Sequence, residues 1–355
     1  MRILITGICG FAGSTIARRL LESTADLTIA GLDNFCRAGS RLNLDPLQKL
    51  GIDIIEGDIR FPEDIARVGA VDWILDAAAN PSVLAGVDGK STSRDLVDHN
   101  LGGTINLLEH CREHGAGFTL LSTSRVYSIP MLCNLSLVEH NNAFAPAEDQ
   151  EFPIGISASG VTETAPTSYP ISLYGATKLA SETIALEYGA TFGFPVFINR
   201  CGVLAGAGQF GRADQGIFSY WLHAWHSQRP LRYIGFDGLG HQVRDCLHPD
   251  DLVPVLKAQM IDQSHDVPRV VNFGGGTGNS MSLRQLSEWC SDRFGAQPVE
   301  ADPQPRRFDV PWVVMDSSLA KESWNWRPQT KLEAILEEIA EHAEKHPDWL
   351  DVTGG

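Results

Sequence analysis

An apolar run near the start of the chain leads directly into a glycine-rich turn. The run Arg2–Ile5 is followed by Gly7, Gly10 and Gly13, in the spacing G-x-x-G-x-x-G. Between a strand and a helix, the first glycine allows a tight turn, the second lets the backbone approach a pyrophosphate, and the third lets helix and strand pack closely. Glycines in this spacing can also form a merely structural turn. Because N–H groups at a helix N-terminus attract anions, we expect a dinucleotide-binding turn at the start of an α/β fold.

Strand and helix patterns alternate through the first half of the chain. We expect strands at residues 2–6, 27–32, 52–56, 71–77, 118–122 and 196–199, and helices at 12–23, 91–114 and 172–190. This alternation predicts a Rossmann-type, doubly wound parallel sheet whose strand C-termini share one edge. We expect an NAD-binding domain at residues 1–199, with a loop insert at 128–168 that has little periodicity. Residues 200–355 are expected to form a smaller α/β lobe that is mostly substrate-binding, with some segments returning to the first domain.

A carboxylate at the end of the second strand bears on the choice of dinucleotide. Asp33 lies twenty residues beyond Gly13, where it can accept hydrogen bonds from the adenosine ribose hydroxyls and would repel a 2′-phosphate. We therefore expect NAD rather than NADP as the cofactor, although Arg37 is close enough to temper this preference. The alternative interpretation is a loop carboxylate beside Asn34.

A tyrosine and a lysine form the second signature. Tyr174 and Lys178 lie four residues apart on an expected helix, and therefore on one face. The strand at 118–122 ends in Ser122 and Thr123, whose hydroxyls could bind a substrate oxygen or, alternatively, only cap the strand end. The ammonium is expected to lower the pKa of the phenol, and the phenolate could take a hydroxyl proton as hydride leaves for the nicotinamide. Together with the glycine turn, these residues predict hydride chemistry at a carbinol carbon.

Composition limits the cellular context and the partners. The formal net charge of −16 argues against nucleic-acid binding, and no apolar run has membrane-spanning length. Seven scattered cysteines predict free thiols in a reducing compartment, and with no recognisable signal peptide we expect a cytoplasmic protein. The tightest candidate metal cluster, His110, Cys111 and His114, is interpreted as a solvated helix end, so we expect no metal site. Trp221 and Trp225 share a helix face and are expected in the core rather than on a bound base.

With these pieces assembled, the chain resembles the extended short-chain dehydrogenase/reductase family, and within it the nucleotide-sugar epimerases and dehydratases. The matching segments are the glycine turn through Ser14, Asp33-Asn34, Gly57 to Arg60, Asn100 to Thr104, Ser122-Thr123, Tyr174 to Lys178, and Val243 to Asp245 with His248 and Asp251-Leu252. The resemblance implies that Thr123, Tyr174 and Lys178 form a catalytic triad. The residues expected to bind the cofactor are Gly7, Gly10, Phe11, Ala12, Gly13, Asp33, Asn34, Asp58, Ile59, Ala77, Ala78, Ala79, Asn100, Ser122, Tyr174 and Lys178. Those expected to bind the substrate are Thr123, Gln209, Asp214, Gln215, Arg244 and Arg306, the two arginines by holding its diphosphate.

Within this family the chain is most similar to the CDP-paratose 2-epimerases. The similarity rests on Cys9 in the glycine turn, on the long insert before Tyr174, and on Gln209-Phe210 followed by Asp214-Gln215-Gly216. It implies an isomerase of carbohydrate biosynthesis that oxidises a CDP-linked sugar at C2 and reduces it again from the other face, regenerating NAD. Ser124-Arg125 stands where sugar dehydratases carry Asp-Glu, which argues against a dehydratase.

Two segments depart from the family pattern, and other functions stay open beside the first one. The usual Arg-x-x-Asn-x-Tyr-Gly is replaced by Arg200 to Gly206, and Asp309-Val310-Pro311 stands for Asp-Gln-Arg, so contacts assigned to those positions are open. A UDP-hexose 4-epimerase would use the same triad, and an NAD-sensing regulator without turnover would need only the glycine turn. A CDP-linked substrate is preferred and a UDP-linked one is the alternative. By family analogy, the helices at 91–114 and 172–190 would form the interface of a homo-oligomer, a dimer or a tetramer.

Overall fold

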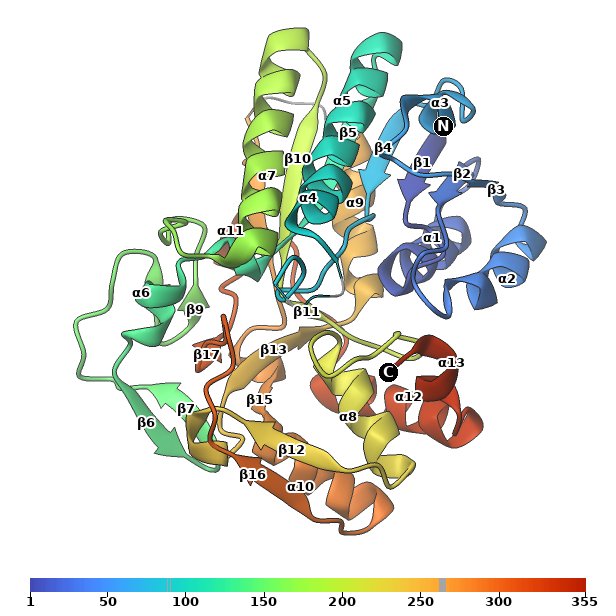
Figure 1. Cartoon of the computed structure of the whole chain (residues 1–355). Helices are drawn as coiled ribbons and strands as arrows, with labels where there is room; N and C mark the ends of the chain where they lie inside the picture. Colours follow the sequence, from blue (N-terminus) through green and yellow to red (C-terminus); the bar gives the residue numbers. More distant parts are fainter. Residues whose placement is uncertain (88, 90, 262–265) are drawn as a thin grey trace.

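A seven-stranded parallel sheet organises the upper half of the molecule (Figure 1). The structure is a computed structural model that describes residues 1–87, 89, 91–261 and 266–355. In sequence order the strands are β1 (Arg2–Thr6), β2 (Thr28–Asp33), β3 (Asp53–Glu56), β4 (Trp73–Asp76), β5 (Gly117–Thr123), β10 (Val196–Cys201) and β14 (Val270–Phe273). Their spatial order is β14-β10-β5-β4-β1-β2-β3, which confirms the predicted Rossmann-type sheet. The order reverses between β1 and β4, so a ligand crevice is expected at their carboxyl ends.

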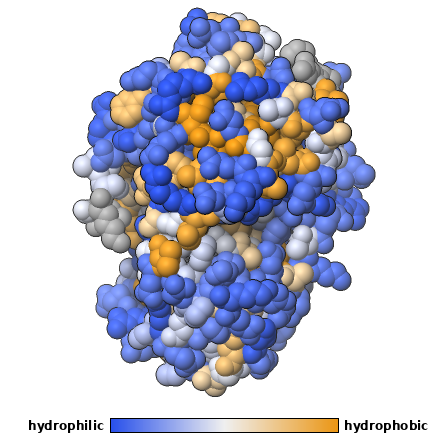
Figure 2. Space-filling model, turned by 90° about the vertical axis from the view of Figure 1, so that its right-hand side faces the viewer, coloured by the Kyte–Doolittle hydropathy of each residue, from blue (hydrophilic) through white to orange (hydrophobic). Residues whose placement is uncertain are grey.

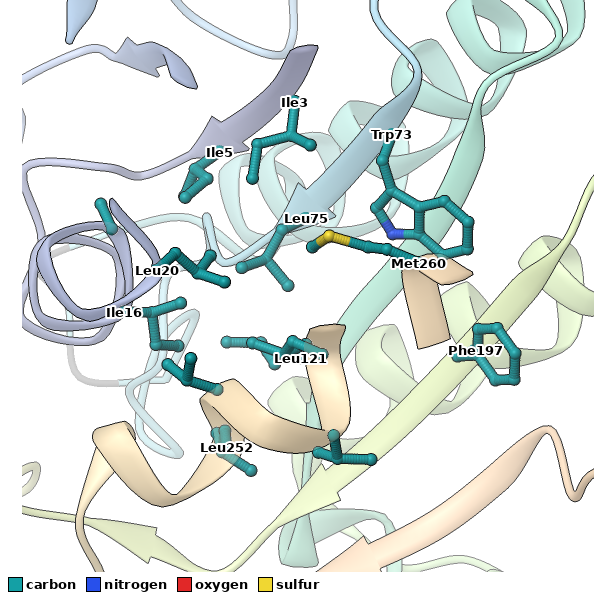
Figure 3. Packing of buried hydrophobic residues seen from close by; sticks show 14 of the residues in the cluster. Ile3, Ile5, Ile16, Leu20, Trp73, Leu75, Leu121, Phe197, Leu252 and Met260 are labelled. Carbon is teal, nitrogen blue, oxygen red and sulfur yellow. The ribbon is translucent and has the colours of Figure 1, made fainter. Parts of the chain in front are cut away.

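Helices cover both faces of this sheet and form a separate core on each side. One face carries α3 (Pro62–Ala66), α5 (Gly103–His114) and α7 (Ser172–Phe192); the other carries α1 (Phe11–Ser23), α2 (Leu44–Lys49), α9 (Val253–Ile261) and α11 (Ser318–Trp324). Figure 3 shows the second of these cores, in which Ile16 and Leu20 of α1 and Met260 of α9 pack against Leu75 in the sheet. Continuous apolar strands are buried on both sides, as in other doubly wound sheets.

The single helix expected at residues 91–114 is interrupted by a π-helical turn. It consists of α4 (Ser93–Val97), a π-helical segment (Asp98–Gly102) and α5. Within that segment Asn100 turns inward: its Oδ1 accepts a hydrogen bond from the Asn80 amide at 2.8 Å, and its Nδ2 donates to Thr177 Oγ1 at 3.1 Å. Such turns often aim a side chain at a functional site, and hydrophobic periodicity does not reveal them.

The prediction of a plain loop at residues 128–168 is wrong. This insert contains α6 (Ile129–Cys133), a hairpin of β6 (Leu137–His140) and β7 (Ala143–Pro146), and a smaller pair, β8 (Ile156–Ser157) with β9 (Gly160–Val161). Asn141 and Asn142 form the two-residue hairpin turn with φ of 48° and 60°, a left-handed geometry that asparagine tolerates. Ser282 Oγ donates to Asn142 O at 2.6 Å, so the hairpin docks on the second half of the chain.

The lower lobe is built mostly from residues after 200. Its elements are β11 (Val203–Leu204), β13 (Val243–Leu247), β15 (Ser280–Ser282) and β17 (Trp312–Val313) in one sheet, the pair β12 (Leu231–Ile234) and β16 (Val299–Asp302), and the helices α8 (Ile217–His226), α10 (Leu283–Phe294), α12 (Leu332–Lys345) and α13 (Trp349–Thr353). Trp221 and Trp225 of α8 are buried in its core, as expected. By contrast, α9, β14 and α11 return to the large sheet.

The two halves differ at the surface as well. Figure 2 views the molecule from the side on which β3 lies, where hydrophobic residues gather over the upper half and the lower half is largely hydrophilic. Leu42, Leu50 and Phe61 are among the exposed large apolar side chains of the upper half. Of the helices in the described residues, none is long and apolar enough to cross a bilayer. The seven cysteines are free, as the sequence predicted.

Candidate active site

A cleft of about 580 Å³ opens between the carboxyl edge of the large sheet and the lower lobe. Most of the residues predicted to bind cofactor or substrate line it, namely Gly7, Gly10, Phe11, Ala12, Gly13, Asp33, Asn34, Ile59, Ala77, Ala78, Ala79, Ser122, Thr123, Tyr174, Gln209, Asp214, Gln215, Arg244 and Arg306. Three others, Asp58, Asn100 and Lys178, are outside this lining. The cleft therefore brings together the glycine turn, the end of β5 and the start of α7.

The glycine turn forms one end of the cleft. Gly7 adopts a φ of +60°, and its N–H donates to Leu32 O at 2.8 Å. A Cβ on Gly13 would lie 2.5 Å from Gly7 O and 2.9 Å from Ile8 Cα, so any side chain there would force the backbone apart. The N-terminus of α1 has no side-chain cap at Gly10, which leaves its first N–H groups free to face an anion.

Asp33 closes the adjacent wall at the end of β2. Its Oδ2 accepts from the Cys9 amide at 2.9 Å and its Oδ1 from the Phe35 amide at 2.8 Å, which fixes the carboxylate beside the turn. Burial raises the pKa of Asp33, and these two amides oppose the rise. Asp58 lies two residues beyond the end of β3 and forms an ion pair of 2.8 Å with Arg60.

Thr123 and Tyr174 both line the cleft. Thr123 is the last residue of β5, and Tyr174, only 8% exposed, lies in the first turn of α7. Burial raises the pKa of Tyr174 to about 12, while a hydrogen bond with the Thr123 side chain and the charge of Arg125 oppose the rise. The expected lowering of this pKa is therefore not found in the structure, because burial outweighs the positive charge nearby.

Lys178 lies one helical turn beyond Tyr174 and is 2% exposed. Burial lowers the pKa of this ammonium, and the charges of Asp76 and Glu182 oppose that shift. Asp76 is itself held by Thr6 Oγ1 at 2.7 Å and Thr104 Oγ1 at 3.0 Å. Lys178 is thus buried near two carboxylates and lies outside the lining of the cleft.

A buried polar network behind the same wall could not be recognised in the sequence. Arg200 Nη2 forms an ion pair with Glu182 Oε2 at 2.7 Å, and Arg200 Nη1 donates to Tyr127 Oη at 3.3 Å. Tyr127 Oη in turn donates to Asn272 Oδ1 at 2.7 Å, and Asn272 Nδ2 reaches Val161 O of the insert at 2.9 Å. In the sequence, Arg200 is a single arginine inside an apolar strand and Glu182 is a glutamate inside a helix. Neither position indicates that the two side chains pair.

The lower lobe supplies the other end of the cleft. Arg244 Nη2 donates to Asp309 Oδ1 and to Val310 O, each at 2.7 Å. Gln209 is 8% exposed; its Nε2 donates to Leu204 O at 2.7 Å, and its Oε1 is buried without a hydrogen-bond partner. Asp214 Oδ2 accepts from Ser82 Oγ at 2.6 Å, which ties the segment 209–216 to the large sheet.

Two histidines that the sequence singled out have structural partners. His248 Nε2 lies 3.2 Å from Glu338 Oε2, and its Nδ1 accepts from the Asp250 amide at 3.3 Å. His110 Nε2 faces Gly69 O at 3.2 Å. Across the part of the chain that the structure describes, no group of three His, Cys, Asp or Glu side chains could hold a metal ion.

Known proteins match this chain over nearly its whole length. A family model described as the NAD dependent epimerase/dehydratase family matches residues 3–274. The chain is 29% identical over 349 residues to CDP-paratose 2-epimerase of Salmonella typhi, covering 93% of this chain and 95% of that protein. It is 28% identical over 349 residues to UDP-glucose 4-epimerase of Corynebacterium glutamicum, covering 95% and 94%.

Solved structures share the fold. UDP-glucose 4-epimerase of Thermus thermophilus, in complex with NAD, superposes with a TM-score of 0.74 and 25% identity, covering 97% of this chain and 99% of that one. UDP-glucuronic acid 4-epimerase of Bacillus cereus, in complex with UDP-glucuronic acid and NAD, gives a TM-score of 0.76 at 24% identity with the same coverage.

Proposed function

The chain belongs to the NAD dependent epimerase/dehydratase family, and from this premise we propose that it epimerises C2 of a CDP-linked dideoxyhexose. NAD is the cofactor of the family, and its sugar-nucleotide epimerases are isomerases. The full-length similarity to a CDP-paratose 2-epimerase supports this choice of sugar and carbon. The observation that carries the proposal is that Thr123 and Tyr174 line the same cleft as the glycine turn, with Thr123 close enough to influence the pKa of Tyr174.

The residues at the glycine turn fit NAD. A Cβ on Gly7 would lie 3.0 Å from Ala78 Cα, so the cradle between β1 and β4 admits only bare backbone. We propose that the turn and the uncapped start of α1 hold the pyrophosphate, and that Asp33 holds the adenosine ribose. The chemistry that NAD supplies when bound is the reversible acceptance of a hydride at the nicotinamide.

Tyr174 is proposed as the group that moves the proton. Its Oη would take the proton of the substrate hydroxyl during oxidation and return it during reduction, while the Thr123 hydroxyl holds the same substrate oxygen. Because burial holds the pKa of Tyr174 at about 12, its phenol is protonated at neutral pH in this structure. Ionisation then depends on positive charge close by, which Arg125 supplies here and to which we propose Lys178 adds.

NMR of candidate substrates tests the proposal. NAD-loaded protein is incubated in deuterium oxide with CDP-paratose and, separately, with UDP-glucose, and each sugar is followed over time. We expect CDP-paratose to convert to its C2 epimer and UDP-glucose to remain unchanged. Clean interconversion of UDP-glucose and UDP-galactose, with CDP-paratose inert, would reverse this ranking.

A UDP-hexose 4-epimerase is the second candidate. It is favoured by the similarity to UDP-glucose 4-epimerase of Corynebacterium glutamicum, which differs by only one percentage point of identity from the first relative (29% against 28%). An NAD-sensing regulator without turnover would have no use for the contact between Tyr174 and Thr123.

We also propose two functional units and a homo-oligomer. Residues 1–199 would bind NAD, and residues 200–355 would mostly bind the nucleotide sugar, except for the segments that join the large sheet. The neighbouring helices α5 and α7 (Figure 1) would form the interface between subunits. Light scattering of the purified protein measures the assembly, and absorbance after denaturation shows whether NAD co-purifies.

A further inference from the structure

Arg125 occupies a fixed place beside the reacting groups. It follows β5 in a short 3-10 turn (Ser124–Val126), and its amide donates to Thr123 Oγ1 at 3.2 Å. The start of α7 packs on its backbone so closely that a Cβ on Gly175 would lie 2.3 Å from Arg125 O. Its side chain lines the same cleft as Tyr174. The turn and the helix therefore fix the backbone of Arg125 at the wall of the cleft.

The charges around Arg125 do not balance. Arg244 is paired with Asp309 at 2.7 Å, but within the described residues neither Arg125 nor Arg306 forms an ion pair. The hydrogen bond that the structure gives the Arg125 guanidinium goes to a neutral acceptor, Phe308 O, at 3.1 Å. Burial lowers the pKa of Arg125 to about 10; the neighbouring charges of Arg244 and Arg306 act in the same direction, and the charge of Asp309 opposes them. This part of the cleft thus holds two positive charges without a carboxylate partner.

We propose that Arg125 binds the sugar-side phosphate of the substrate's diphosphate and holds it next to Tyr174. The inference rests on the proposed function only in taking a nucleoside-diphosphate sugar as the substrate. A diphosphate diester carries two negative charges, which match the two unpaired cations. A guanidinium has five N–H donors, and Arg125 uses one on Phe308 O, so others can reach phosphate oxygens in a charge-assisted contact.

This contact would determine where the sugar lies. Arg244 and Arg306 belong to the lower lobe, whereas Arg125 lies in the turn that directly follows β5 of the large sheet, two residues from Thr123. A phosphate held by Arg125 would bring the first sugar carbons against the Thr123 and Tyr174 hydroxyls. Arg125 also replaces an acidic residue that elimination would need, so the same side chain would favour epimerisation.

The test compares nucleotides that do or do not carry the second phosphate. Calorimetry measures the binding of CDP, CMP, UDP and UMP to NAD-loaded protein, with wild type, Arg125→Met and Arg125→Gln. We expect both variants to lose about tenfold or more in affinity for the diphosphates and less than about twofold for the monophosphates. Arg125→Gln retains a donor for Phe308 O, so it separates loss of charge from loss of that structural contact.

Arg307→Met is the matched control. Arg307 lines the same cleft, is exposed, and lies with its guanidinium 5.7 Å from the Phe308 ring. Its removal should leave the ratio of CDP to CMP affinity unchanged. Equal losses for CDP and CMP, no loss, or full recovery of diphosphate binding in Arg125→Gln would each overturn the inference. Since the measurement needs no turnover, a protein that binds CDP through Arg125 yet epimerises no sugar would contradict only the proposed function.

Discussion

At the end of the cleft where we propose that the cofactor binds, the wall includes one short stretch of closely approaching backbone, Gly7 to Gly13, with the Asp33 carboxylate beside it. At the end where we propose that the substrate binds, the lining comes from segments far apart in the sequence and includes Gln209, Arg244 and Arg306. The glycine-turn end depends on the close approach of main-chain atoms. The other end depends on several polar side chains, each of which can be substituted separately. A single substitution should therefore damage the cofactor end severely and the substrate end only in part.

The two ends of the cleft are also held to the rest of the protein by different interactions. The glycine turn belongs to the continuous core between β1, α1 and β4, where Ile16 and Leu20 are fully buried. The segment 209–216 is tied instead by hydrogen bonds: Ser82 to Asp214, Arg37 to Phe210 O, and Trp349 Nε1 to Gln209 O at 2.9 Å. Polar contacts of this kind can rearrange at lower cost than a packed core, which suits a region that must admit and release substrate.

The largest effect is expected at the point where the two ends meet. Tyr174→Phe removes the proposed proton carrier but keeps the ring that packs at the start of α7. We expect turnover to fall by about three orders of magnitude, within the range for loss of a general acid–base group, while NAD content is unchanged. Turnover is measured by stopping the reaction at fixed times and determining the converted substrate. NAD content is measured from the absorbance of NAD released on denaturation. Turnover near the wild-type rate would remove Tyr174 from the mechanism.

Gly13→Ala tests the cofactor end directly. The added Cβ would meet backbone atoms of Gly7 and Ile8 at 2.5 and 2.9 Å, and neither can move without opening the turn. We expect NAD affinity to fall by about a hundredfold, since a few kcal/mol of strain corresponds to that factor. NAD titration measured by protein fluorescence provides the value.

Gly278 provides the control for the backbone strain expected in Gly13→Ala. A Cβ on Gly278 would have no atom within 4 Å, so Gly278→Ala should bind NAD as the wild type does. If Gly13→Ala bound NAD equally well, the close approach would not govern the cofactor end.

At the substrate end, Gln209→Met should have a smaller effect. The change removes a buried amide whose Oε1 is without a hydrogen-bond partner and whose Nε2 is held by Leu204 O. If that oxygen awaits a substrate donor, we expect KM to rise about five- to tenfold with NAD affinity unchanged, as for the loss of one or two hydrogen bonds. The exposed Gln48→Met, on α2, is the control. A loss of NAD binding in Gln209→Met would mean that the two ends are not separable.

The same contrast explains what the sequence could predict. Gly7, Gly10, Gly13 and Asp33 are related by short spacings that strand and helix geometry fix, so the sheet, its crevice and this wall could be predicted. Arg244 and Arg306 were placed only through the family resemblance. Nothing in the sequence indicated that Arg244 is paired with Asp309, because the pairing depends on how strand β13 and the loop before β17 come together in space.

Buried polar partners were the least predictable part. Glu182 and Arg200 come from different elements, and neither spacing nor periodicity connects them. The strands within the predicted insert were missed for another reason: they are only two to four residues long, too short for alternation to be recognised. The Asn141-Asn142 pair is a turn signal within the insert, and it marks the hairpin that docks on the lower lobe.

The smallest effect is expected from pH, and only at the substrate end. Glu338 binds both His248 and the Ala207 amide, at 3.2 Å each, and so anchors the loop that leads to Gln209. Although burial lowers the pKa of His248, the hydrogen bond and charge of Glu338, with Asp250 nearby, raise it overall; the pKa of Glu338 is lowered, chiefly by His248.

These shifts fix the direction of the pH dependence. A raised histidine pKa stabilises the fold below about pH 6.5 and loses that contribution as pH rises through the folded-state pKa; a lowered glutamate pKa contributes above about pH 4.3. Because Glu338 is 44% exposed, solvent screens the pair, and we expect only about 0.5 kcal/mol. Urea unfolding should show His248→Gln less stable than wild type by more at pH 6 than at pH 8.5. An equal gap at both pH values would mean that His248 anchors this loop as a neutral ring, and the substrate end would then be as insensitive to pH as the glycine turn.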